Sequence, residues 1–122
     1  MALNKLKLME FRNNCMQKLD RAYRPTRNVI RFSHTETIEH YLQKCKVCYE
    51  LKKMNLEFVC EARFYGGKRA DIYVIDKDLA IEILHTEKDE NLEKKRREYP
   101  CFVVGIRTKE EITPERVEKL IN

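Results

Sequence analysis

The sequence has no run of about 18 apolar residues, the length that a membrane-spanning helix needs, so a transmembrane helix is excluded. Residues 1–15 contain no continuous apolar segment followed by a small-residue cleavage site, so we expect no secretory signal. Internal repeats and low-complexity segments are also missing. What is present is a chain of 122 residues, 43% apolar and 37% charged, which fits one folded domain with a strongly ionised surface.

The five cysteines are an odd number, and without a secretory signal they indicate reduced thiols in an intracellular, cytoplasmic protein. Cys45 and Cys48 form a C-x-x-C pair, but no second Cys or His pair occurs at ligand spacing. Cys60 and Cys101 occupy apolar positions of predicted strands, where cysteine packs as a small hydrophobe. We therefore predict packing roles, with zinc binding or redox chemistry as the alternative.

Basic residues outnumber acidic ones by 25 to 20, which gives a net charge of +5 and an isoelectric point near 9.0. A positive surface attracts the phosphate backbone of nucleic acids, because each bound Lys or Arg releases a condensed counterion. The alternative is a solvated surface that happens to be basic. Charge favours nucleic acid as the partner, and no membrane partner is expected.

The periodicity of the apolar residues predicts a chain that mixes helices and strands. In chain order the predicted elements are a helix at 3–23, an extended connector at 28–32, a helix from Ser33 or Thr35 to Asn55, strands at 56–64, 69–75 and 79–84, a helix at 90–99, a strand at 101–106 and a helix from Thr113 to Ile121. Asp89 is expected to cap the helix at 90–99, and Thr113-Pro114 is a strong helix start. The second helix carries an apolar stripe that includes Ile38, Leu42 and Tyr49.

Two of the predicted strands are apolar on both faces, which is typical of central strands covered by helices. The strand at 79–84 has this pattern with one exception, Glu82. The strand at 101–106 has it throughout, so we expect it to be central and parallel to its neighbour. Residues 1–30 are predicted to form an N-terminal helical extension, and residues 31–122 the domain itself.

A carboxylate inside a central strand has to be paired, bound to a metal or protonated, because burial of a lone charge is costly. Asp71 lies on the preceding strand, so a hairpin would bring it next to Glu82. Two converging carboxylates form an oxygen-rich site suited to Mg²⁺ or Mn²⁺. The alternative is a structural ion pair between Glu82 and Arg69 or Arg63.

The acids and their spacing resemble the PD-(D/E)XK nuclease superfamily. The residues that carry the resemblance are Glu61, the Arg69-Ala70-Asp71 stretch, and Ala80-Ile81-Glu82-Ile83, in which ten residues separate the two acids. The resemblance implies a restriction-endonuclease-like αβββαβ core with a mixed central sheet flanked by helices. It also implies that the metal ligands are Asp71 and Glu82, helped by Glu61 or by Glu50 or Glu39 on the preceding helix.

Within that superfamily the chain is most similar to competence-protein CoiA-like proteins and to the endonuclease domains of segmented negative-strand viral polymerases. This likeness rests on His40-x-x-x-Lys44, on the segments RADIYVID and AIEILHT, and on Lys95-x-x-x-Tyr99. The resemblance implies that His40 could be a metal ligand, as a helix histidine is in the viral enzymes. The alternative is a surface or packing histidine, and Tyr99 is expected to pack under its helix.

The superfamily's lysine, two residues after the second acid, is replaced by Leu84. In several related branches the lysine has moved to the following helix, and Lys95 could take that role here. Other lysines that could take the role of the missing lysine are Lys94, Lys88 and Lys68, the last of which lies near Asp71 in the sequence. The competing explanation is a domain that has lost catalysis and kept binding.

The predicted function is a nuclease that hydrolyses nucleic-acid phosphodiester bonds with Mg²⁺ or Mn²⁺, with DNA favoured over RNA. His85 follows the third strand and could contact substrate or transfer a proton. Arg69, Arg96 and Arg97 are expected to bind the phosphate backbone, although a run of charges is usually a solvated helix face. Alternatives are an inactive nucleic-acid-binding module and an interaction subunit that forms a homodimer through its first helix.

Overall fold

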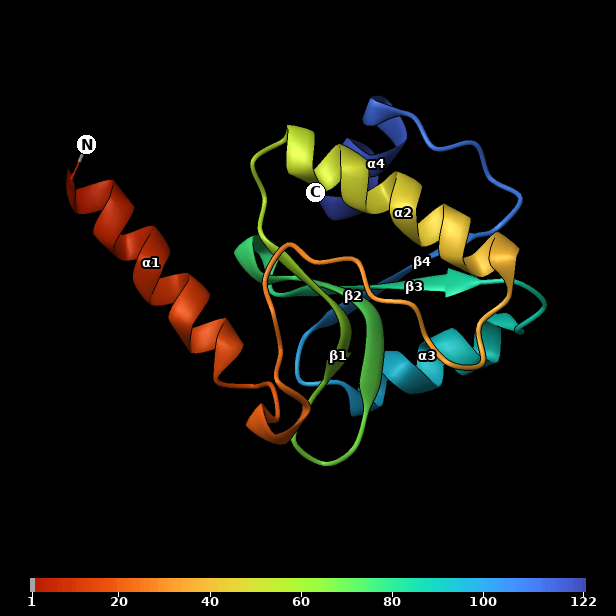
Figure 1. The fold of residues 1–122 in the computed structure, drawn as a ribbon, viewed down its shortest axis with the longest axis horizontal. Helices are drawn as coiled ribbons and strands as arrows, with labels where there is room; N and C mark the ends of the chain where they lie inside the picture. Colours follow the sequence, from red (N-terminus) through yellow and green to blue (C-terminus); the bar gives the residue numbers. More distant parts are fainter. Residues whose placement is uncertain (1) are drawn as a thin grey trace.

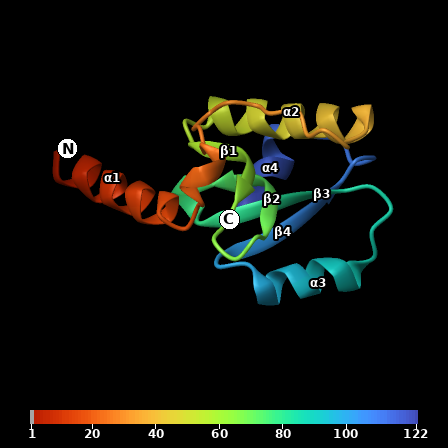
Figure 2. The same ribbon diagram turned by 60° about the horizontal axis from the view of Figure 1, so that its bottom comes forward.

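The computed structural model describes residues 2–122, which form one four-stranded sheet with helices on both faces (Figures 1 and 2). The elements are α1 (Ala2–Met16), η1 (Arg21–Tyr23), α2 (Ile38–Lys53), β1 (Phe58–Arg63), β2 (Arg69–Val74), η2 (Ile75–Lys77), β3 (Leu79–Leu84), α3 (Asp89–Glu98), β4 (Phe102–Arg107) and α4 (Pro114–Ile121). No helix among residues 2–122 is both long and apolar enough to cross a membrane.

The strand order is β1-β2-β3-β4, antiparallel for the first two pairings and parallel for β3 and β4. The predicted α/β class with a mixed sheet is therefore confirmed. Strand β3 is central and all six of its residues are buried, as predicted. Strand β4 is parallel to β3 as predicted, but it lies at the edge of the sheet and Phe102 is 74% exposed, so its predicted central position was wrong.

The two faces of the sheet are covered by different helices (Figure 2). Helices α2 and α4 cover one face through residues such as Val47, Leu51 and Val117. Helix α3 lies on the other face, where the crossover from β3 to the parallel strand β4 places it. Each buried aliphatic side chain contributes about 1.5–3 kcal/mol by leaving water.

The side of helix α2 that faces the sheet matches the predicted apolar stripe only in part. Ile38, Leu42 and Tyr49 are exposed, whereas Gln43 and Lys44 are buried. The buried polar groups have partners: Nε2 of Gln43 donates to the backbone oxygens of Arg107 and Glu110, both at 2.8 Å. The apolar residues Val47 and Leu51 therefore set the buried side of α2, and the partnered polar groups lie beside them.

The ends of three helices differ from the predicted ends. Helix α1 ends at Met16 instead of near residue 23, because Leu19 leaves the helix to form a bridge with Phe64. Helix α2 begins after Thr37, whose side chain accepts from the backbone of His40, and not after Ser33 or Thr35. Helix α3 already includes Asp89, the predicted cap.

The N-terminal helix extends away from the sheet and contacts it only near its end (Figure 1). Cys15 is buried, whereas Leu6, Met9 and Phe11 are exposed. The division of the chain at residue 30 and a homodimer through this helix stay predictions.

Candidate functional site

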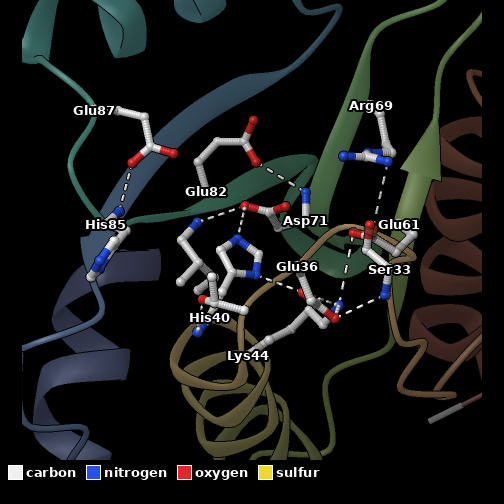
Figure 3. Close-up of polar contacts among 12 residues, drawn as sticks. Ser33, Glu36, His40, Lys44, Glu61, Arg69, Asp71, Glu82, His85 and Glu87 are labelled. Atoms are coloured by element: carbon white, nitrogen blue, oxygen red, sulfur yellow. Dashed lines mark hydrogen bonds and ion pairs between the residues drawn. The ribbon is translucent and has the colours of Figure 1, made fainter.

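The strands β2 and β3 separate at the point where the two predicted acids lie. Their ladder ends at the pair Ile72 and Ile81. Beyond it, the backbone nitrogen of Asp71 donates to Oε2 of Glu82 at 2.9 Å, and the backbone nitrogen of Ile83 donates to Oδ2 of Asp71 at 2.8 Å. The carboxylates thus replace the missing ladder bonds, and the predicted closeness of the two acids is present in the structure (Figure 3).

Glu82 is 1% exposed and lies on the side of the sheet that α3 covers. Its Oε1 lies 3.2 Å from Nζ of Lys95, and the hydroxyl of Tyr99 donates to the same oxygen at 2.6 Å. Burial and the charge of Asp71 raise the pKa of Glu82 to about 7, although Lys95 acts in the opposite direction. The ion-pair partner of Glu82 is therefore Lys95 instead of Arg69 or Arg63.

Asp71 pairs with His40, the histidine of α2. His40 Nε2 lies 3.3 Å from Oδ2 of Asp71, and Nδ1 lies 2.6 Å from Oε2 of Glu36. Its hydrogen bond to Asp71, with the charges of both acids, raises the pKa of His40 to about 9 against the effect of burial. Burial alone would raise the pKa of Asp71, but His40 and the backbone nitrogen of Ile83 hold it below its ordinary value. Protonated His40 and ionised Asp71 form an ion pair.

A second ion pair, between Glu36 and Lys44, lies next to His40. Lys44 is 0% exposed, and its Nζ lies 2.9 and 3.0 Å from the two carboxylate oxygens of Glu36. The backbone nitrogen of Ser33 also donates to Glu36, at 2.9 Å. These donors overcome the effect of burial and lower the pKa of Glu36. The spacing of Glu36, His40 and Lys44 by four residues explains why they share one side of the α2 region.

Glu61 has a backbone conformation that sets it apart from its neighbours in β1. The residues on either side, Cys60 and Ala62, pair with β2, whereas Glu61 has a φ of 51°, in the left-handed region. Its Oε2 is buried without a hydrogen-bond partner, and the nearest cations, Lys44 and Arg69, each lie 3.8 Å from one of its oxygens. Burial raises the pKa of Glu61. A buried acceptor without a partner costs about 1–3 kcal/mol.

These side chains surround an open cavity of about 350 Å³. Its lining includes Glu36, His40, Glu61, Arg69, Asp71, His85 and Lys95. Figure 3 shows the acids and His40 directed toward one another from α2, β1, β2 and β3. Glu82 does not line the cavity and lies behind it.

Several predicted residues lie away from this cavity. Lys68 and Lys94 both pair with Glu98, at 2.7 and 3.8 Å. Glu50 pairs with Lys53 at 3.1 Å farther along α2. Among the described residues these three therefore do not join Asp71 and Glu82.

The remaining predicted residues are at the surface. Arg96 donates to the backbone oxygen of Val103 at 3.1 Å, and Arg97 is exposed on α3. Lys88 and Glu39 are exposed as well. His85 lies at the mouth of the cavity, and its Nδ1 is 2.9 Å from Oγ1 of Thr108.

Three participants were missed or given another role in the sequence-based prediction. Glu36 had no predicted role in the site, Lys44 was only part of a resemblance, and Tyr99 was predicted to be a packing residue. Tyr99 does pack under α3, but its hydroxyl also lies 2.6 Å from the backbone oxygen of Arg69 and contacts Glu82. Its position one helical turn after Lys95 was the available signal.

Within the described residues, no group of three or more His, Cys, Asp and Glu side chains is arranged to hold a metal ion. The donors nevertheless fit a hard divalent cation, because Oε2 of Glu61 is a buried carboxylate oxygen without a hydrogen-bond partner in the same cavity as Asp71. The C-x-x-C cysteines are free thiols, and Sγ of Cys48 lies 3.5 Å from Sγ of Cys60.

No protein-family model, curated protein or solved structure matches this chain.

Proposed function

We propose that this protein is a metal-dependent nuclease that hydrolyses phosphodiester bonds, with DNA as the favoured substrate, on a restriction-endonuclease-like core. The order α2-β1-β2-β3-α3-β4 agrees with the expected αβββαβ order. The observation that carries the proposal is the contact between Nζ of Lys95 and Oε1 of Glu82, at 3.2 Å. It supports the expectation that a lysine on α3 replaces the one displaced by Leu84.

Asp71 and Glu61 line the cavity and would hold Mg²⁺ or Mn²⁺, with Glu82, the third expected ligand, buried directly behind them. The bound ion would polarise the phosphodiester and lower the pKa of an attacking water. Glu61 supplies an oxygen without a partner, whereas Glu82 uses both its oxygens in contacts with the protein.

Lys95 and His40 supply positive charge to the cavity that they both line. The side chain of Lys95 is 35% exposed, so its ammonium can reach a phosphate in the cavity while it remains next to Glu82. His40 is protonated because its pKa is raised to about 9. Fixed positive groups of this kind stabilise the charge that develops on a phosphate during hydrolysis.

Cleavage of DNA and RNA in Mn²⁺, Mg²⁺ and EDTA tests the proposal. Lys95→Ala should lower the rate on the order of 100-fold, and Glu82→Gln should lower it at least as much. Lys94→Ala is the matched control on the same helix, because its side chain is 69% exposed and pairs with Glu98. Cleavage that survives Glu82→Gln, or equal effects of the two lysine variants, would overturn the assignment of the site.

A second function, a nucleic-acid-binding module without catalysis, is favoured by one observation. Asp71 and Glu82 both accept from backbone nitrogens of the separated strands, which is a structural use of the acids. Binding of DNA or RNA without cleavage in any of the three metal conditions would support this function over the first.

A further inference from the structure

A second cavity, of about 340 Å³, lies next to the candidate site. The two cavities share four lining residues: Ser33, Thr35, Glu61 and Arg69. They therefore adjoin one another, and the two together, here called the groove, extend from Lys95 and Asp71 toward the segment between η1 and α2. The proposed nuclease site occupies one end of this groove, and the proposed function gives the other end no role.

Exposed aromatic rings line the far end of the groove. Phe32 is 62% exposed, and its ring lies 4.9 Å from that of Tyr41, which supports it from one side. Tyr23 is 51% exposed, and the guanidinium of Arg63 lies 4.5 Å from the centre of its ring. Aromatic rings that are held in place and left open to solvent are suited to stacking against a planar group.

Three arginines line the same end: Arg31, Arg63 and Arg69. Arg31 also fixes the segment, because it donates to the backbone oxygens of Tyr23 at 3.3 Å and Arg24 at 2.7 Å. Against these three cations the lining of this cavity has one acid, Glu61. The groove therefore combines a positive lining with two preformed aromatic surfaces.

We propose that this groove binds an unpaired nucleic-acid strand, with bases stacked on Phe32 and Tyr23 and phosphates at the arginines. The assignment of the strand as substrate rests on the proposed nuclease function. In a duplex the faces of the bases are covered by their neighbours, so exposed rings gain nothing from it. A single strand can turn its bases outward onto aromatic side chains while a positive groove follows its backbone.

Binding of a fluorescent single-stranded oligonucleotide in EDTA, measured by anisotropy with the full chain, tests this proposal without cleavage. The single strand should bind more tightly than the duplex of the same sequence. Phe32→Ala should weaken single-strand binding about tenfold, and Phe32→Trp should restore it. The matched control is Phe102→Ala, because Phe102 is 74% exposed on β4, outside the groove. DNA and RNA strands are measured side by side to identify the preferred sugar.

An oligonucleotide that consists of abasic sites separates stacking from charge. Phe32→Ala should leave its binding unchanged, whereas Arg69→Gln should weaken it. Duplex binding as tight as single-strand binding, or equal effects of Phe32→Ala and Phe102→Ala, would overturn the proposal. If single-strand binding depends on Phe32 but no metal supports cleavage, the nuclease function fails and the groove assignment stands.

Discussion

The hairpin of β2 and β3 has an acidic pair at each end, and the pair at the turn is fully neutralised. Asp76 accepts from Arg12 at 2.6 and 2.9 Å, and Asp78 accepts from Lys18 at 2.9 and 2.7 Å. The hydroxyl of Tyr73 also donates to Asp78, at 2.6 Å. Both cations come from the α1 region, so these acids fasten the N-terminal segment to the sheet.

Each acid of the pair at the open end also has one cation, but here the two carboxylates are close together and next to a cavity. Asp71 and Glu82 lie close to each other, and the negative charge of Asp71 disfavours ionisation of Glu82. Lys95 contacts Glu82, and His40 contacts Asp71. Strongly shifted pKa values next to a cavity are typical of functional sites. The same residue type therefore has two uses in one hairpin.

The largest effect on stability is expected at the turn. Asp78→Ala removes the ion pair with Lys18 and leaves the buried hydroxyl of Tyr73 without its acceptor, so unfolding should require about 3 kcal/mol less free energy. Urea denaturation at neutral pH measures this change. Asp89→Ala is the control, because that carboxylate is 90% exposed, and it should alter stability by less than about 1 kcal/mol. Equal losses would contradict the structural role of Asp78.

At the open end, the buried carboxyl of Glu82 should make the stability of the protein depend on pH. The pKa of Glu82 is raised to about 7 from 4.5, so the folded state binds more protons than the unfolded state in that window. The contribution of Glu82 to stability therefore falls as the pH rises through it. Glu82→Gln removes this titration. Between about pH 5 and about pH 8 the wild type should lose on the order of 2 kcal/mol relative to the variant.

Denaturation curves at several pH values measure that difference. Glu111→Gln is the matched control, because it removes one carboxylate at an exposed position outside the site. A wild type and a Glu82→Gln variant with parallel pH profiles would show that burial does not shift the pKa of Glu82.

The smallest change in stability is expected for two tyrosines, each of which donates a hydrogen bond to one of the two acidic pairs. Tyr73→Phe removes a hydrogen bond to Asp78, and Tyr99→Phe removes one to Glu82. A bond to a charged acceptor contributes more than one to a neutral acceptor. Because Glu82 is partly protonated near neutral pH, we expect losses of about 2 kcal/mol for Tyr73→Phe and about 1 kcal/mol for Tyr99→Phe.

Thermal unfolding at about pH 7 distinguishes the two variants, with Tyr65→Phe as the exposed control. A larger loss for Tyr99→Phe than for Tyr73→Phe would reverse the comparison between the two ends.

Local patterns predicted the strands and the position of the acids well. The continuous apolar run at Leu79–Leu84 predicted a buried central strand, and the turn before it predicted the hairpin that brings Asp71 to Glu82. Thr113 caps α4 as predicted, and Pro114 occupies its first turn. These features depend on neighbours in sequence, which a single chain displays directly.

Features that depend on partners distant in sequence were predicted poorly. The burial of Lys44 requires Glu36 and Glu61 to meet it, and no apolar pattern signals such a contact. Helix α2 turns Val47 and Leu51 toward the sheet, whereas Ile38 and Leu42 of the predicted stripe are exposed. The edge position of β4 depends on how many strands the sheet has, which the composition of that strand does not contain.

Helix α3 has a consequence for how the site opens. None of its ten residues is buried, yet it supplies Lys95 to Glu82. An element with so little apolar burial exchanges its amide hydrogens through local unfolding, well below the free energy of global unfolding. The ammonium of Lys95 therefore stays next to Glu82 only while α3 remains folded. Conditions that loosen this helix would expose the acid while the rest of the sheet remains folded.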